Sequence, residues 1–395
     1  MKLFLPVLLA SIFLSKVYGQ EDLPPKFEAQ VIDNVVEIGY GIAIGDVDGD
    51  QNKDILMVDK KQVVWYRNPD WKRFVIAENL TEKDNVCIAA RDVDGDGKVE
   101  VAVGAQWNPG ETENKEESGA VFYLEATENP EEIWEVIPLF HTPTVHRMHW
   151  VKIAETKFQL VMLPLHGEGN KNGDGDNPVK AIIYDLPSKP LVKNAWQFGF
   201  INTGMHKTHN FDIVTNEKTG AEGLLIAGKE GAKLFENKLG RWKSGEELPK
   251  VNGSGEVRWG ISNKKKNSRF LMTIEPMHGH ELVYYDDFKF GKRRVLTGEL
   301  NQGHALACAD LLGMNSDQVV VGWRNKDNED KVGIKLFVPD KRFINWKSYL
   351  IDGNNMACED LKVADLDNDG KLDIIASGRA SHNLIVYWNR NVLSN

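Results

Sequence analysis

Three short segments of the sequence carry carboxylates at a spacing that suits a hard cation. Each segment has acidic residues at positions 1, 3, 5 and 9, with glycine at or beside the bend. Ca²⁺ takes about six to eight oxygen ligands, and such a spacing can supply them. The expected calcium ligands are Asp46, Asp48, Asp50 and Asp54 in the first segment, Asp92, Asp94, Asp96 and Glu100 in the second, and Asp365, Asp367, Asp369 and Asp373 in the third.

The residues around these segments decide between the alternatives. Aspartate and glycine also form ordinary hairpin turns without an ion. Three copies of one spacing, at one position of a repeat, favour structural calcium sites over turns alone. Apolar segments bracket each loop and no glutamate stands at position 12, which excludes a helix-flanked EF-hand.

Histidine is the second residue type that could do chemistry. The sequence has ten histidines, and a neutral imidazole suits both metal ligation and proton transfer near neutral pH. Arginine and tryptophan recur near several of them. Arginine can fork onto a carboxylate, and tryptophan can stack on the apolar face of a sugar ring.

A repeat supplies the elements that would position these residues. Each acidic segment is followed by an apolar strand and then by a strand rich in aromatic and β-branched residues, as β-structure favours. This last strand occurs seven times, which predicts an all-β, seven-bladed β-propeller. Its copies are 63–66, 120–123, 181–184, 233–235, 282–285, 334–337 and 384–387.

The two ends of the chain fit a closed ring. No fourth strand follows the last copy, whereas an unmatched strand at residues 27–32 opens the mature chain. We therefore expect the N-terminal strand to complete the last blade, which leaves no long unpaired sheet edge. Residues 21–395 are expected to form this single domain. Residues 1–20 resemble a cleaved secretory signal, with Lys2 before a short apolar run.

The Asp-Val-Asp-Gly-Asp loop between apolar strands, followed by Val-Trp-Tyr-Arg-Asn-Pro, resembles the FG-GAP or VCBS propeller repeat. The Trp-Tyr-Arg-Asn-Pro strand and the histidine-rich segments resemble the propellers of aldos-2-ulose dehydratase and of the L-rhamnose–glucuronate lyases. The resemblance implies a carbohydrate-active propeller. FG-GAP propellers also occur in adhesion proteins, so the fold alone does not decide the function.

Blade geometry predicts where the histidines lie. The start of an inner strand and the end of the second strand share one face of the disc, and the acidic turns lie on the other. Nine of the ten histidines map to the first face by this alignment. The expected catalytic residues there are His146, His149, His209 and Tyr40. The expected substrate-binding residues are Arg147, Trp107, Trp323, Arg324, Arg379 and His278. The candidate ligands of a central divalent metal are His166, His206 and His304.

These residues favour a lyase or dehydratase that acts on a sugar or uronate by β-elimination. The alternative is a non-catalytic, calcium-stabilised propeller that binds a glycan or a protein. Glycoside hydrolysis by paired carboxylates ranks third, because the histidine-bearing face shows few acidic residues, such as Glu168, Glu275 and Glu281.

Composition limits the partners and the compartment. A formal net charge of −10 argues against a nucleic-acid partner. The N-terminal apolar run is too short to span a bilayer, and we expect a secreted or periplasmic protein. Three cysteines, Cys87, Cys308 and Cys358, are too few for a disulfide framework. They are expected to be buried thiols, with one bridge as the alternative. A closed ring needs no partner, so a monomer is expected.

Overall fold

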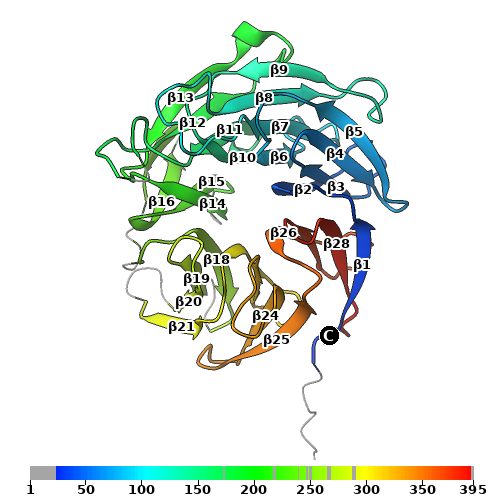
Figure 1. The fold of residues 1–395 in the computed structure, drawn as a ribbon, viewed down its shortest axis with the longest axis vertical. Helices are drawn as coiled ribbons and strands as arrows, with labels where there is room; N and C mark the ends of the chain where they lie inside the picture. Colours follow the sequence, from blue (N-terminus) through cyan, green and yellow to red (C-terminus); the bar gives the residue numbers. More distant parts are fainter. Residues whose placement is uncertain are drawn as a thin grey trace, which may run out of the picture.

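The computed structural model describes residues 24–392 except 172–173, 217–218, 239, 246–247, 249–250, 265–267 and 287–290. Within these residues the chain forms seven four-stranded antiparallel sheets around a central axis (Figure 1). One short 3₁₀ helix, η1 (Lys193–Ala195), is the only helical element there. The all-β, seven-bladed prediction is therefore confirmed. The signal predicted over residues 1–20 lies outside the described residues.

Each blade runs from an inner strand at the axis to an outer strand at the rim (Figure 1). The inner strands are β2 (Gly41–Gly45), β6 (Cys87–Arg91), β10 (Val145–Ala154), β14 (Thr208–Thr215), β18 (Glu256–Ser262), β22 (Gly303–Ala309) and β26 (Cys358–Ala364). The second strands are β3 (Asp54–Val58), β7 (Glu100–Ala105), β11 (Lys157–Pro164), β15 (Glu222–Gly228), β19 (Ser268–Glu275), β23 (Gln318–Trp323) and β27 (Asp373–Gly378).

The third strands coincide with the seven copies counted in the sequence. They are β4 (Gln62–Arg67), β8 (Ala120–Glu125), β12 (Lys180–Asp185), β16 (Gly231–Lys238), β20 (Glu281–Tyr285), β24 (Gly333–Pro339) and β28 (Asn383–Asn389). The outer strands are β5 (Lys72–Glu78), β9 (Glu135–Leu139), β13 (Gln197–Asn202), β17 (Arg241–Ser244), β21 (Arg293–Thr297), β25 (Trp346–Gly353) and β1 (Phe27–Asp33).

The N-terminal strand closes the ring as expected. β1 pairs antiparallel with β28, with Phe27 opposite Asn389 and Val31 opposite Ile385. The last blade therefore joins the two ends of the described chain, and the pairing hides an edge that would otherwise be exposed.

The core consists of the layers between blades. In one layer, Ile42 and Ile55 of the first blade pack with Ile375 and Val386 of the last. Similar layers of buried apolar residues lie between the other neighbouring blades. Burial of apolar area is the main source of stability for such sheets. All three cysteines are free thiols, so the single-bridge alternative is wrong.

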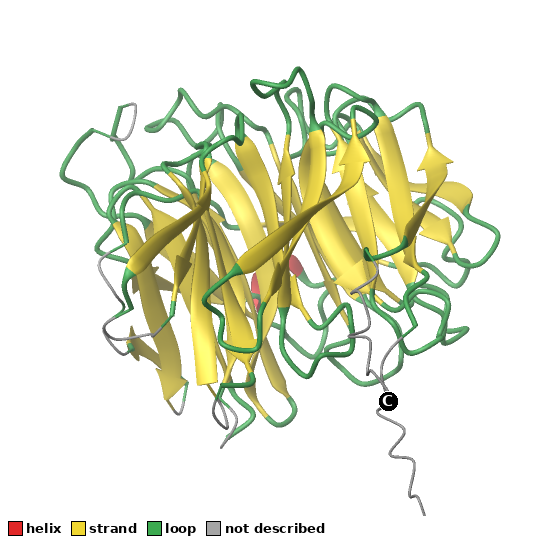
Figure 2. Cartoon of the chain, turned by 90° about the horizontal axis from the view of Figure 1, so that it is seen from below, coloured by secondary structure: helices red, strands yellow, loops and turns green. Residues whose placement is uncertain are grey.

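Strand loops gather at the two ends of the disc (Figure 2). We call the end where the inner strands begin the funnel face, and the end where they turn into the second strands the turn face. The acidic segments join β2 to β3, β6 to β7 and β26 to β27, so they lie on the turn face.

Candidate functional site

Four inner strands share an irregularity where they begin on the funnel face. Each has a break in register against the second strand of its blade, in β10, β14, β22 and β26. A β-bulge of this kind leaves a residue unpaired and redirects its side chain. The residues passed over are His146, His209 with Asn210, His304, and Glu359.

Three histidines meet on the funnel face. The metal-ligating nitrogens of His209, His278 and His304 all lie within 4.8 Å of one another. The Nε2 atoms of His209 and His278 are 2.6 Å apart, and the rings of His209 and His304 are 5.3 Å apart between centroids. His278 comes from the turn between β19 and β20, where its φ of 52° aims the ring from the side. We call these residues the histidine trio.

Backbone carbonyls fix the tautomers of two members of the trio. His209 Nδ1 lies 2.9 Å from the Gly255 carbonyl oxygen, and His304 Nδ1 lies 2.6 Å from that of Glu359. A carbonyl oxygen only accepts hydrogen bonds, so each Nδ1 must carry the proton. Each neutral ring then presents the unprotonated Nε2 to the centre. Ligating histidines are oriented in this way by outer-shell acceptors.

Electrostatics keep the trio neutral. Burial, followed by the neighbouring His209 and then the Arg324 charge, lowers the pKa of His278 to about 2. Burial also lowers the pKa of His209 and holds that of His304 well below its usual range, where the Arg324 guanidinium adds to the effect. Neutral imidazole is the form that binds a metal.

The donor set of the trio fits a transition metal better than calcium. Zinc sites with catalytic function commonly have three protein ligands and one open position, and imidazole nitrogen is a preferred ligand. Calcium instead prefers oxygen. Two Nε2 lone pairs at 2.6 Å repel one another unless a proton or a cation lies between them. The trio therefore suits zinc or a related divalent metal.

His146 stands beside the trio. Its Nδ1 donates to the His209 carbonyl oxygen at 2.7 Å, which leaves Nε2 as the acceptor. Arg147 donates to that Nε2 at 3.3 Å. Trp107 stacks on the His146 ring with centroids 5.0 Å apart. Burial and the neighbouring Arg147 charge hold the pKa of His146 well below its usual range, so the ring is a neutral proton acceptor.

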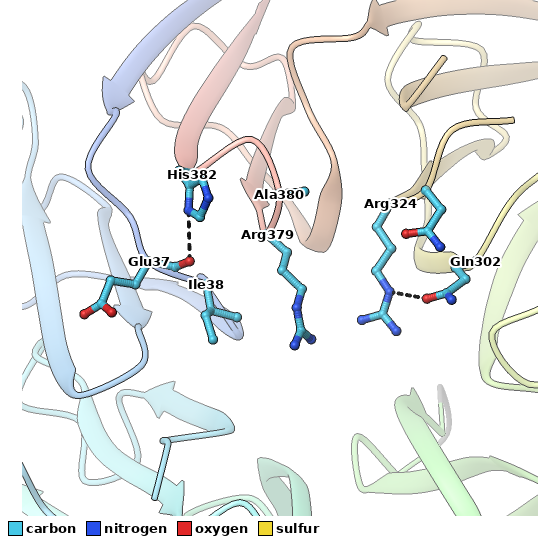
Figure 3. Close-up of a pocket in the computed structure, with 8 residues that line it drawn as sticks. Glu37, Ile38, Gln302, Arg324, Arg379, Ala380 and His382 are labelled. Carbon is cyan, nitrogen blue, oxygen red and sulfur yellow. Dashed lines mark hydrogen bonds between the residues drawn. The ribbon is translucent and has the colours of Figure 1, made fainter. Parts of the chain in front are cut away.

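Two arginines line a hollow of about 510 Å³ on the funnel face, which we call the arginine hollow. Figure 3 shows the Arg324 and Arg379 side chains extending in the same direction, with Arg324 bonded to Gln302. Both arginines contact the buried Glu359 carboxylate, at 2.8 Å and 3.5 Å. The backbone carbonyl of Glu359 also holds His304. Glu359 thus links the arginine hollow to the trio.

Tyr40 lies under Arg379, whose guanidinium is 5.5 Å from the ring centroid. Its hydroxyl donates to the Asp84 carboxylate at 3.1 Å. Burial, followed by the Asp84 charge, raises the pKa of Tyr40. The Tyr40 hydroxyl proton therefore points at Asp84, which places it poorly for the acid role expected of Tyr40 from the sequence.

The structure separates His149 from His146. His149 lies further along β10, in a small cavity between the inner strands that Arg147, Arg258 and Asp360 also line. Its ring contacts Phe211, with centroids 4.7 Å apart, and burial lowers its pKa to about 3. It is not part of the trio and does not share the environment of His146.

Three further expectations need correction. Trp323 is 0 % exposed, and its indole N–H donates to the Lys331 carbonyl oxygen, so it cannot stack on a substrate. His206 pairs with Glu230 at 2.7 Å, away from the trio. His166 bridges to Lys207 and also lies outside the trio. Of the three expected metal ligands, only His304 lies in the trio, and the other two places belong to His209 and His278.

Sequence reasoning missed Glu256. This buried residue lies 3.4 Å from His209 Nδ1 and accepts hydrogen bonds from the Asn210 side chain. Arg258 balances its charge at 3.2 Å. The available signal was its place at the start of an inner strand, next to the position where three other blades carry a histidine as the second residue of the strand.

On the turn face, the acidic segments gather their carboxylates. Asp46, Asp48 and Asp50 form one group, Asp92, Asp94 and Asp96 a second, and Asp365, Asp367 and Asp373 a third. In the first two segments the residue at position 9 instead accepts backbone amides, with Val47 bonded to Asp54 and Val93 to Glu100. Asp369 of the third segment pairs with Lys371 at 2.7 Å.

Among the described residues, no helix is long and apolar enough to cross a membrane.

Three parts of the chain match known protein families. Residues 46–103 match an FG-GAP-like repeat and residues 88–124 an FG-GAP repeat. Residues 118–288 match the β-propeller domain of aldos-2-ulose dehydratase. The chain is thus a seven-bladed propeller with FG-GAP repeats, similar to the propeller of that dehydratase.

Whole-chain comparisons extend this similarity. Aldos-2-ulose dehydratase of Phanerodontia chrysosporium is 23% identical over 382 residues. The match covers 88% of this chain but only 39% of that relative.

Among solved structures, a chain of the mitotic checkpoint complex has a TM-score of 0.57 at 9% identity, covering 100% of this chain and 99% of its own. A rhamnogalacturonan lyase has a TM-score of 0.52 at 12% identity, covering 93% and 76%. Both structures share the fold at these low identities.

Proposed function

We propose that this protein is a carbohydrate-active lyase or dehydratase that uses a metal held by the histidine trio to eliminate water or a sugar from its substrate. The observation that carries the proposal is the convergence of one ring nitrogen from each of three histidines, two of which have rings oriented by backbone carbonyls. The similarity to a sugar dehydratase over most of the chain supports the carbohydrate substrate.

The arrangement suits the demands of β-elimination. This reaction removes a proton alpha to a carbonyl or carboxylate, stabilises the resulting enolate and releases an oxygen at the beta carbon. A metal at the trio would supply positive charge to the developing enolate oxygen. His146 is the proposed base, since its Nε2 is an unprotonated acceptor beside the trio. Arg147 donates to that atom and holds His146 neutral, and it would turn to the substrate to free the Nε2 lone pair for proton transfer.

The arginine hollow supports an anionic substrate. Arg324 and Arg379 together carry two positive charges against the single buried carboxylate of Glu359. Arg379 remains 43% exposed and can fork onto a substrate carboxylate. We therefore propose a uronate at this position, with a neutral keto-sugar as the alternative substrate.

Calcium is proposed for the turn face alone. The groups of three carboxylates there lie at the far ends of the inner strands from the trio. Burial raises the pKa of Asp54 to about 7 and that of Glu100 to about 8. Backbone hydrogen bonds oppose this rise, and the neighbouring carboxylates of each segment add to it. A bound cation would relieve this cost and pin the turns. Export through the N-terminal segment is part of the same proposal, since extracellular calcium would fill such sites.

A product assay tests the proposal. β-Elimination from a uronate or a keto-sugar leaves a carbon–carbon double bond conjugated to a carbonyl, which absorbs in the near ultraviolet. We expect a rising signal on at least one member of a panel of uronate-containing glycans and keto-sugars supplied with zinc. Saturable glycan binding with a flat trace on every substrate would instead favour the binding propeller.

A further inference from the structure

Three phenylalanines form an exposed cluster at the rim, apart from the histidine trio. Phe140, Phe198 and Phe200 are 36%, 45% and 49% exposed, and they are the only exposed phenylalanines among the described residues. The Phe140 and Phe198 rings stack at 4.1 Å, and Phe200 meets Phe198 edge-on at 5.9 Å. Single exposed apolar residues are common on protein surfaces, but a contiguous aromatic group marks an interaction site.

The aromatic cluster is held rigidly. Phe198 and Phe200 alternate along the outer strand β13, which pairs along its length with β12. Phe140 follows β9 in the neighbouring blade, and its carbonyl oxygen accepts the Tyr184 hydroxyl at 2.6 Å. A preformed surface loses little conformational entropy when a ligand binds.

Two hollows of about 470 Å³ each flank the cluster, and Phe140 lines both. Phe198 lines the first together with Lys115, His141 and Asn194. The second is lined by Phe200 with polar neighbours, which are Glu113, Thr142, His166, Glu168, Asn177 and Lys180. Both volumes fall in the range of small-ligand sites, about 300 to 1,000 Å³.

Polar atoms without partners lie in the walls of these hollows. His141 Nδ1, Thr142 Oγ1 and His166 Nδ1 are buried and have no hydrogen-bond partner. His166 is only 6% exposed, and burial lowers its pKa to about 4, so the ring is neutral and offers one donor and one acceptor. Buried polar atoms normally have partners. The residues that carry these three atoms therefore have unused hydrogen-bonding capacity beside the hollows.

We propose that the aromatic cluster and the hollow lined by His166 form a second saccharide-binding site, separate from the histidine trio and the arginine hollow. This inference rests on the carbohydrate part of the proposed function. A pyranose ring has an apolar face of C–H groups that packs on an aromatic ring, and hydroxyls at its edge that need polar partners. The second hollow offers both, and it shares no lining residue with the arginine hollow. The site would hold a remote part of a polymeric glycan.

The polar lining favours a sugar over a protein partner. A stable protein interface buries about 800 Å² on each side around an apolar centre. Here the Phe140 and Phe200 rings share a concave site with Glu113, Glu168 and Lys180. A second copy of the chain is the competing occupant, and the experiment below distinguishes the two.

The test uses His304→Ala protein, so that binding is measured without turnover and independently of the proposed reaction. Native gels containing rhamnogalacturonan, polygalacturonate or dextran would report binding as retarded migration. We expect at least one of these glycans to retard His304→Ala protein. The added Phe198→Ala and Phe200→Ala substitutions should weaken that binding about tenfold, and Phe200→Trp alone should preserve it.

A matched control removes exposed apolar side chains elsewhere. Ile344 and Leu350 are 57% and 49% exposed, and changing both to alanine should leave migration unaltered. Equal retardation with and without the two phenylalanines would overturn the proposal, as would no retardation by any of the three glycans. Light scattering that shows a dimer dissociated by the same two substitutions would also overturn it, in favour of a second copy.

Discussion

The two faces of the propeller carry polar groups that are built in different ways. On the turn face, each acidic group comes from a single turn of about nine residues, within one blade. On the funnel face, the histidine trio draws one residue from each of three blades, at positions 209, 278 and 304. The turn face is local in sequence, whereas the funnel face depends on closure of the ring.

This difference separates stability from chemistry. A turn that binds a cation can stabilise its own hairpin whatever the rest of the ring does. The trio exists only when the blades are in register, and β-bulges at the strand starts direct the side chains of His209 and His304. We therefore expect substitutions on the funnel face to change activity with little effect on stability, and substitutions on the turn face to do the opposite.

The largest expected effect follows from His304→Ala. Removing an outer-shell partner of a metal lowers activity about 10- to 100-fold, and loss of a direct ligand should exceed that range. The measurement is the near-ultraviolet product signal on a confirmed substrate. His206→Ala is the matched control, because His206 pairs with Glu230 outside the trio. Undiminished turnover by the His304→Ala protein would contradict the assignment of the chemistry to the funnel face.

The turn face should respond in stability. Filling a site at 100 times its Kd adds about 2.7 kcal/mol to the free energy of unfolding. Asp48→Asn and Asp94→Asn each remove a carboxylate from a group of three. Each variant should lose part of the rise in Tm that calcium gives the unaltered protein, and the double variant should lose more, while turnover at low temperature stays the same. A calcium effect of equal size in the variants would contradict this assignment.

Arg379→Met sharpens the assignment of the arginine hollow. A hydrogen bond between charged groups contributes about 1.5 to 3 kcal/mol, so KM for a uronate substrate should rise at least about tenfold. KM for a neutral keto-sugar should change little. Arg241→Met, on an exposed outer strand, serves as the control. An equal rise in KM for both substrates would exclude a carboxylate contact.

The smallest effect concerns His166 and pH. Burial lowers its folded pKa to about 4, against about 6.5 in the unfolded chain. The unfolded state therefore binds more protons between these values, and stability falls as pH drops from about 6.5 toward 4. His166→Gln should remove part of this slope. Urea unfolding at both ends of this pH window gives the change in the free energy of unfolding with pH for each protein. An identical change in the unaltered and His166→Gln proteins would show that His166 does not contribute.

Much of the architecture could be predicted because its signals are local. The third strands combine aromatic and β-branched residues within a few positions, and the acidic turns have a fixed spacing. The unmatched strand at residues 27–32 even indicated how the ring closes, and β1 pairs with β28 accordingly. Such patterns depend on neighbours along the chain.

The site was only partly predictable because side-chain direction depends on register. His146, His209, His278 and His304 were all placed on the correct face. The sequence could not show that bulges bring His209 and His304 together, or that Trp323 points into the core. It also could not show that the carbonyl of Glu359 would hold His304. These outcomes come from contacts between blades.

Metal titration tests the central claim most directly. Zn²⁺ would be titrated calorimetrically into chelator-stripped protein, with calcium present to occupy the turn face. We predict one tight zinc site per chain in the unaltered protein, and its loss in His209→Ala and His304→Ala proteins that keep their Tm. Zinc binding of the same stoichiometry and affinity in all three proteins would contradict the account.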